Sequence, residues 1–103
     1  MKLFTKRYKR IVVENHSFLC VIDYTPNHEY ISFKIYPART KTSIVSILFS
    51  WAVNWQTNLN TPRACAILIK YALQIGWDPT QEHHVIKIEQ GDFLVDELRL
   101  REC

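Results

Sequence analysis

The segment Thr61–Pro79, TPRACAILIKYALQIGWDP, has a start signal, a stop signal and a long apolar stripe between them. Thr61 can cap the first turn with its hydroxyl. Pro62 suits the first helical position, where its missing N–H removes no hydrogen bond. Gly76 can adopt the left-handed conformation after the last turn, and Pro79 blocks continuation. The segment therefore predicts one long helix.

The predicted helix, residues 61–76, is amphipathic, because at about 100° per residue its apolar side chains share a broad arc. That arc holds Ala64, Cys65, Leu68, Ile69, Tyr71, Ala72, Leu73 and Ile75. Arg63, Lys70 and Gln74 lie on the opposite side, and Ile67 lies beside Gln74. Ile67 is either a singly exposed apolar residue, which is normal, or a contact with a partner.

The size and composition of the chain are those of an ordinary globular protein. It has 103 residues, of which 48% are hydrophobic and 22% are charged. These values predict a single domain, residues 1–103, that can bury a core without a disulfide or a metal. The net charge of +3 permits an acidic partner but does not require one.

The cysteines and the N-terminus predict a cytoplasmic protein. The three cysteines, Cys20, Cys65 and Cys103, have no paired spacing and are interpreted as buried or incidental thiols in a reducing compartment. The basic start, MKLFTKRYKR, is not followed by an uninterrupted apolar stretch, since residues 14–16 are polar. No apolar run reaches the ~18–20 residues of a membrane span, so no membrane partner is expected.

Three strands are predicted within the first 36 residues. Residues 8–13 are rich in β-branched side chains, and the polar sequence ENHS connects them to a second strand over residues 18–24. This second strand is apolar on both alternating faces, which is typical of a strand covered on both sides. Residues 30–36 (YISFKIY) alternate cleanly between apolar and polar positions and predict the third strand.

Residues 42–55, TSIVSILFSWAVNW, fit either a strand or a helix. The strand pattern separates large side chains from small or polar ones better, so we favour a strand from about Ser43 to Trp51. After the helix, residues 84–89 predict a short strand. Residues 92–101 predict a short helix capped by Asp92, with a strand as the alternative.

These elements predict an α+β fold. An antiparallel β-meander of about four to five strands is packed by one long helix, residues 61–76, with a short C-terminal helix possible. One helix can cover only one face of such a sheet, yet the sequence supplies apolar residues for both. Either the C-terminal segment or a second copy of the chain must cover the other face. A homodimer is the leading hypothesis, because closed two-fold dimers are the commonest oligomers.

No recognisable motif for catalysis or cofactor binding occurs in the sequence. The only glycines, Gly76 and Gly91, are too far apart for a phosphate loop, and GxSxG, HExxH and CxxC are absent. His83 and His84 would point to opposite faces of a strand, so they cannot both bind a metal from regular geometry. We therefore expect no catalytic residue, no cofactor and no metal. An enzyme would need a pocket that brings His28, His83 or His84 to a carboxylate or thiol.

A basic and aromatic pattern is the best positive signal for a binding surface. Tyr8, Tyr30, Lys34 and Tyr36 are placed to share a sheet face with Arg10. Basic residues between aromatic ones on an open sheet bind single-stranded nucleic acid in some folds. Tyrosines with a wet hydroxyl also line many ordinary strands. The candidate interaction surface is Arg10, Tyr30, Lys34, Tyr36 and Ile67.

Two parts of the chain carry a resemblance to a known type of protein. They are the opening hairpin RIVVENHSF, residues 10–18, and the helix from Thr61-Pro62 to Gly76-Trp77-Asp78-Pro79. Together they resemble small uncharacterised bacterial proteins with a "TP…IxxAL…GWxP" helix after a β-meander, of the kind found on integron gene cassettes and near toxin–immunity loci. The resemblance covers about a third of the chain and implies no catalytic residues. It implies an accessory protein of a mobile gene that acts through protein binding.

The leading hypothesis is therefore a small cytoplasmic, non-enzymatic interaction protein, accessory or immunity-like, that is dimeric and binds an unknown protein partner. The alternative is a nucleic-acid-binding module that uses the basic N-terminus and a tyrosine-bearing sheet face.

Overall fold

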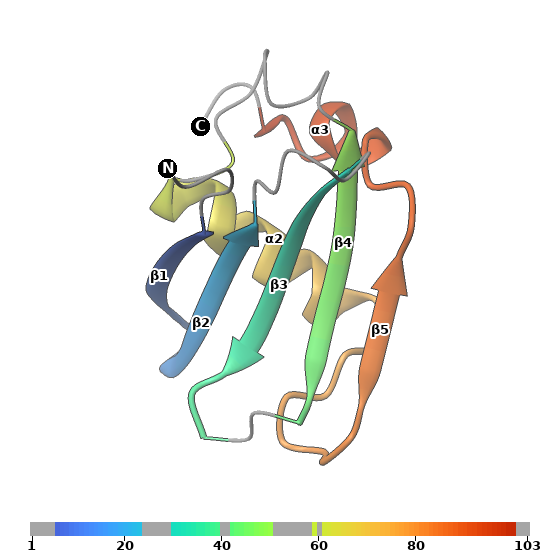
Figure 1. The fold of residues 1–103 in the computed structure, drawn as a ribbon. Helices are drawn as coiled ribbons and strands as arrows, with labels where there is room; N and C mark the ends of the chain where they lie inside the picture. The colour runs from blue at the N-terminus through green and yellow to red at the C-terminus, as the bar shows by residue number, and fades with distance from the viewer. Residues whose placement is uncertain (1–5, 24–29, 40–41, 51–58, 60, 101–103) are drawn as a thin grey trace, which may run out of the picture.

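A computed structural model of the chain describes residues 6–23, 30–39, 42–50, 59 and 61–100. In these residues a five-stranded sheet in the order β1-β2-β3-β4-β5 packs against helix α2, and a short helix α3 follows the last strand (Figure 1). The elements are β1 (Lys6–Val13), β2 (His16–Asp23), β3 (Tyr30–Pro37), β4 (Ile44–Ser50), α2 (Pro62–Gln74), β5 (Val85–Ile88) and α3 (Phe93–Glu97). The predicted α+β class is confirmed.

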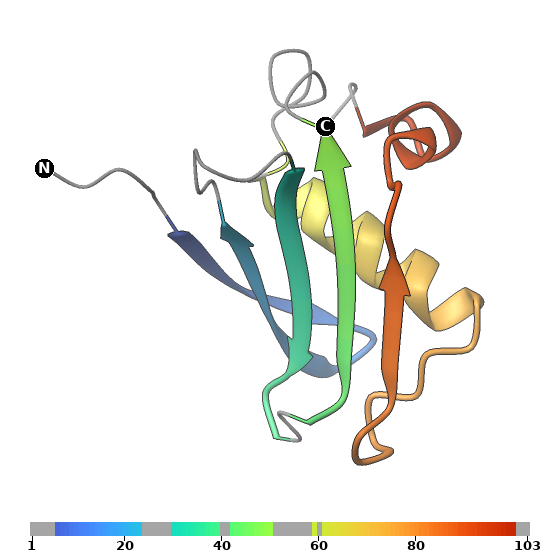
Figure 2. The same cartoon turned by 45° about the vertical axis from the view of Figure 1, so that its right-hand side comes forward.

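The sheet is mixed, which corrects the prediction of a wholly antiparallel meander. Strands β1 to β4 pair in antiparallel fashion, but β5 pairs with β4 in parallel, with Ile44 opposite Val85. The reason is the connection: α2 carries the chain back along the sheet before β5 begins (Figure 2). Two adjacent strands joined through a helix run in the same direction.

The capping signals at both ends of helix α2 are those that the sequence indicates. The Ala64 N–H donates to the Thr61 hydroxyl over 3.1 Å, and Pro62 occupies the first turn. At the other end Gly76 has a φ of 107°, in the left-handed region that favours glycine. The helix has 13 residues and ends at Gln74, so it is shorter than the predicted span to residue 76.

A two-residue turn joins β1 to β2. Glu14 and Asn15 have φ angles of 51° and 67°, as the hairpin turns that match the twist of the strands require. Val13 therefore pairs with His16, and the register continues to Lys6 opposite Asp23. The polar segment ENHS was correctly predicted to contain the turn, although its last two residues belong to β2.

The core lies between α2 and one face of the sheet. The buried strand residues on that face are Ile11, Val13, Phe18, Cys20, Ile22, Ile31, Phe33, Ile35, Val45, Ile47 and Phe49. Helix α2 meets them with Ala64, Cys65, Leu68, Ile69 and Ala72. Trp77 folds back after the helix, and its ring centroid lies 5.8 Å from that of Phe18. Each large aliphatic side chain buried in this way contributes about 1.5–3 kcal/mol to stability.

The two ambiguous segments are now assigned where the structure describes them. Ile44–Ser50 is a strand with alternating burial, as favoured from the sequence, and residues 51–55 lie outside the described residues. The predicted C-terminal helix is present as α3. Asp92 does not cap it through its side chain; the carboxylate instead accepts hydrogen bonds from the Ser50 N–H and hydroxyl over 2.8 and 2.6 Å.

No helix in the described part of the chain is both long enough and apolar enough to cross a membrane.

Gly91 provides a test of how the C-terminal segment is fixed to the sheet. Its N–H donates to the Leu48 carbonyl over 2.8 Å, and a Cβ at this position would lie 3.1 Å from that oxygen and against the Ile47 side chain. Because the carbonyl belongs to the backbone of β4, it cannot move aside. We expect Gly91→Ala to lower the free energy of unfolding by about 1–3 kcal/mol in urea denaturation. The neighbouring Gln90→Ala, at an exposed position, is the control; equal stability of the two variants would contradict this account.

Candidate functional site: the open face of the sheet

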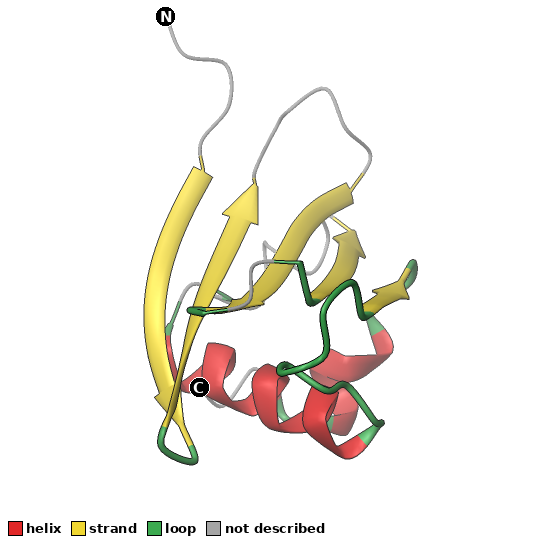
Figure 3. Cartoon of the chain, turned by 90° about the horizontal axis from the view of Figure 1, so that it is seen from below, coloured by secondary structure: helices red, strands yellow, loops and turns green. Residues whose placement is uncertain are grey.

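The sheet has one face covered by α2 and a second face that no described helix covers, although Asp92 and Phe93 lie beside Ser50 and Tyr30 at one corner. Figure 3, in which the helices lie to one side of the strands, shows this arrangement. We call the second surface the open face. Its residues are Tyr8, Arg10, Val12, Ser17, Leu19, Val21, Asp23, Tyr30, Ser32, Lys34, Tyr36, Ile44, Ser46, Leu48, Ser50, Val85 and Lys87. These positions alternate along each strand with the buried residues of the core.

The open face carries many apolar side chains. More than half of its residues are aliphatic or tyrosine. Tyr8 is 64% exposed and Val12 is 67% exposed, whereas Leu19 and Val21 are half-buried among their neighbours. Single exposed apolar residues are common, but a contiguous group that spans several strands is typical of an interaction surface.

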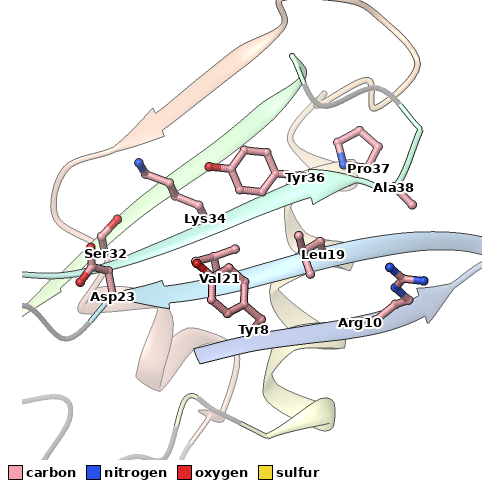
Figure 4. A pocket seen from close by; sticks show the side chains of 10 residues that line it. All are labelled: Tyr8, Arg10, Leu19, Val21, Asp23, Ser32, Lys34, Tyr36, Pro37 and Ala38. Carbon is pink, nitrogen blue, oxygen red and sulfur yellow. The ribbon is translucent and has the colours of Figure 1, made fainter. Parts of the chain in front are cut away.

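A hollow of about 410 Å³ lies over β1, β2 and β3 on this face (Figure 4). It is lined by Tyr8, Arg10, Leu19, Val21, Asp23, Ser32, Lys34, Tyr36, Pro37 and Ala38. The strand register explains its shape. Leu19 lies between Arg10 on β1 and Tyr36 on β3, and in the next row Val21 lies between Tyr8 and Lys34. The hollow therefore has an aliphatic floor between two rims that carry tyrosine and a cation.

The charges on the open face are predominantly positive. Arg10, Lys34 and Lys87 come from β1, β3 and β5, and the only carboxylate among the described residues of the face is Asp23, at one end of the hollow. A surface with this excess of cations attracts an acidic partner.

The structure brings together four of the five residues proposed from the sequence. Arg10, Lys34 and Tyr36 line the hollow, and Tyr30 lies further along β3, beside a second hollow of about 360 Å³ near Ser50. Ile67 does not join them. It lies on α2, on the other side of the sheet, half-buried and packed against the core.

Leu19 and Val21, which form the floor, were not predicted to belong to the site. Their strand was expected to be covered on both sides, and that pattern itself was the available signal. A strand with apolar side chains on both faces fits two arrangements: a second layer of the same chain covers the outer face, or a partner binds to it.

Cys20 and Cys65 meet inside the core, where β2 faces α2. Both are buried, and the Cys65 thiol donates to the Leu59 carbonyl over 3.8 Å. The hydrogen bond between the two thiols, together with burial, raises the pKa of Cys20. The same hydrogen bond lowers the pKa of Cys65. Both thiols are buried, as predicted from the sequence; Cys103 lies outside the described residues.

The histidines near β5 have structural contacts. The half-buried His84 accepts a hydrogen bond through Nδ1 from the Asp78 N–H over 3.0 Å, and His83 is exposed with a φ of 60°. The Thr80 hydroxyl and N–H donate to the Asp78 carboxylate and lower its pKa. Among the residues that the structure describes, no three His, Cys, Asp or Glu side chains gather as a metal site would require.

Comparisons with known protein families, curated proteins and solved structures find no match to this chain. The resemblance to proteins of integron gene cassettes therefore stays a prediction.

The buried thiols give a prediction about chemical reactivity. Alkylation needs a thiolate that the reagent can reach. Both thiols are buried, and a raised pKa also keeps Cys20 protonated at pH values near 8. We expect iodoacetamide to leave Cys20 and Cys65 unmodified in the native protein and to modify both in denaturant, as read by mass spectrometry of peptides. The variant Tyr36→Cys, with a thiol on the open face, is the positive control. Alkylation of Cys20 as fast as that of the introduced thiol would contradict the burial.

Proposed function

We propose that this chain is a non-enzymatic protein-interaction module that binds its partner through the open face of the sheet. The observation that carries the proposal is the hollow over β1 to β3, where Leu19 and Val21 form an apolar floor between Tyr8, Arg10 and Tyr36. Tyrosine and arginine are enriched among the residues that dominate binding energy at protein interfaces. A partner side chain placed on this floor would be screened from water by the surrounding rims.

The resemblance drawn from the sequence adds a biological setting to this proposal. It supports an accessory or immunity-like protein encoded on a mobile bacterial gene, which would act in the cytoplasm by holding another protein. Such a role requires a surface and no catalytic group, in agreement with the open face.

The simplest partner is a second copy of the chain. Two sheets can pack face to face at a spacing of about 10 Å, with their apolar side chains interdigitated. A two-fold dimer formed in this way would cover Leu19, Val21 and Leu48 in both copies. It would also bring the cations Arg10 and Lys34 of both copies into one interface, so added salt should strengthen it.

The oligomeric state tests this form of the proposal. We expect light scattering at micromolar concentration to give twice the chain mass of 12.2 kDa for the wild type. Val21→Glu, which places a charge in the apolar floor, should give a monomer, because an unpaired charge is costly to bury in an interface. Lys70→Glu, on the exposed side of α2, should stay dimeric and controls for the added acid. A monomeric wild type would exclude the second copy as partner.

The same two variants test for a different protein partner. Capture from a bacterial lysate should retain at least one protein with the wild type and with Lys70→Glu but lose it with Val21→Glu. If the two variants retain identical proteins and the wild type is also monomeric, the open face is not an interaction surface.

A second function, binding of single-stranded nucleic acid, is favoured by one observation. Tyr8 and Arg10 lie on one rim of the hollow, and Tyr36 and Lys34 lie on the other. In proteins that bind single strands, aromatic rings stack on the bases and cations contact the phosphates. Stacking on one tyrosine contributes about 1–3 kcal/mol per base.

Filter binding of an oligodeoxythymidine decides between nucleic acid and protein. If the face binds nucleic acid, affinity should fall steeply between about 50 mM and 200 mM salt. Tyr36→Ala should weaken it about tenfold, the loss of about 1.4 kcal/mol from one stacked base, while Lys70→Ala changes little. Absence of salt-sensitive binding would exclude this function.

A further inference from the structure

Strand β1 leaves one long edge of the sheet unpaired within the described chain. It has eight residues, pairs only with β2, and lies at the rim of the sheet (Figure 1). The opposite edge strand, β5, has four residues. Short edge strands protect a sheet against unwanted pairing, and β1 lacks that protection.

The hairpin register shows which backbone groups of β1 point outward. In a two-residue hairpin the residues that flank the turn, here Val13 and His16, form a hydrogen-bonded pair, and the pattern then alternates. The Ala38 N–H donates to the Ser17 carbonyl over 3.0 Å, which agrees with this pattern. The backbone groups of Ser17 therefore point toward β3, and those of its two neighbours in β2 point toward β1. The N–H and C=O groups of Tyr8, Arg10 and Val12 therefore point away from the sheet.

The side chains of the same three residues lie on the open face. Tyr8 and Val12 are among its most exposed members, and Arg10 lies on the rim of the hollow. A segment paired with this edge would thus form backbone hydrogen bonds and would also place alternate side chains next to Tyr8 and Arg10.

The charge of β1 decides what kind of segment can pair there. The strand KRYKRIVV carries four cations and no acid. Pairing with β1 of a second copy would set these cations against one another, and like charges on facing strands destabilise a pair. The same cations attract a strand that carries glutamate or aspartate. Nucleic acid lacks the regular N–H and C=O spacing that the edge presents, so the edge itself favours a polypeptide.

We propose that β1 binds an extended acidic segment of a partner protein, which adds to the sheet as a sixth strand. This inference rests on the proposed protein-interaction role, and it assigns to that role a partner chemistry and a mode of binding. Backbone hydrogen bonds at Tyr8, Arg10 and Val12 supply the pairing, and Arg10 selects an acidic side chain beside it.

Fluorescence anisotropy with a labelled eight-residue peptide that alternates glutamate with valine tests the proposal on the whole chain. The wild type should bind this peptide, and a peptide with lysine in place of glutamate should bind at least about tenfold more weakly. Arg10→Glu should weaken binding of the glutamate peptide about tenfold at low salt, with a smaller effect at high salt.

The backbone contribution is tested at Val12. Val12→Pro removes one outward N–H and adds a ring on the outer edge without breaking a bond to β2, so peptide binding should be lost. Val12→Thr, which keeps the N–H, should bind as the wild type does. Circular dichroism of each variant reports whether it is folded, and Arg10→Glu provides the test if Val12→Pro does not fold.

The outcomes separate this inference from the proposed function. Equal binding by Val12→Pro and Val12→Thr, equal binding of the two peptides, or no binding by the wild type would overturn strand addition at β1. None of these results would affect the dimer mass or the capture that Val21→Glu tests. Conversely, peptide binding with no effect of Val21→Glu on mass or capture would support the edge and contradict the open face.

Discussion

The packing of α2 against one face of the sheet is the contact on which the rest of the structure depends. The small side chains Ala64, Cys65 and Ala72 let the helix approach the strands closely, and Leu68 and Ile69 fill the space between them. Because a two-layer domain has one core, this contact fixes which face of every strand is buried. The alternation along the strands then leaves the other set of side chains outside, so the open face is a direct consequence of where the helix lies.

The same helix also sets the order and direction of the strands at one edge. As a crossover between β4 and β5, it makes β5 parallel to its neighbour, and the chain then continues beside β4 in the same direction, where the Gly91 N–H donates to the Leu48 carbonyl. The edge formed by β5 is therefore only four residues long, and the residues after it continue beside β4. The edge at β1 has no such continuation among the described residues, and its lysines and arginines are its evident safeguard against pairing with itself.

Local features of the fold could be predicted from the sequence, whereas relations between distant segments could not. Caps such as Thr61 and the alternation in YISFKIY depend on neighbouring residues, so their pattern is complete in the sequence. The direction of β5 depends on the path of a whole connection. A strand, a helix and a second strand in succession are the usual signature of a parallel crossover, so the order of the elements along the chain already indicates a parallel β5.

The candidate site shows the same limit in a more instructive form. Alternation along the strands is enough to predict which face of the sheet Arg10, Tyr30, Lys34 and Tyr36 occupy. In the structure all four lie on the same face. Ile67 was placed outside the core because the helical projection puts it beside Gln74 on the polar side, whereas in the structure it is half-buried and packs against the core.

Leu19 and Val21 raise a question that alternation cannot answer. It shows that they face away from Cys20, but not whether another layer covers them. When the second layer is absent from the described chain, apolar outward positions on a central strand become evidence for a partner. The same residues that misled the prediction of a doubly covered strand are thus the strongest argument that this sheet binds something outside itself.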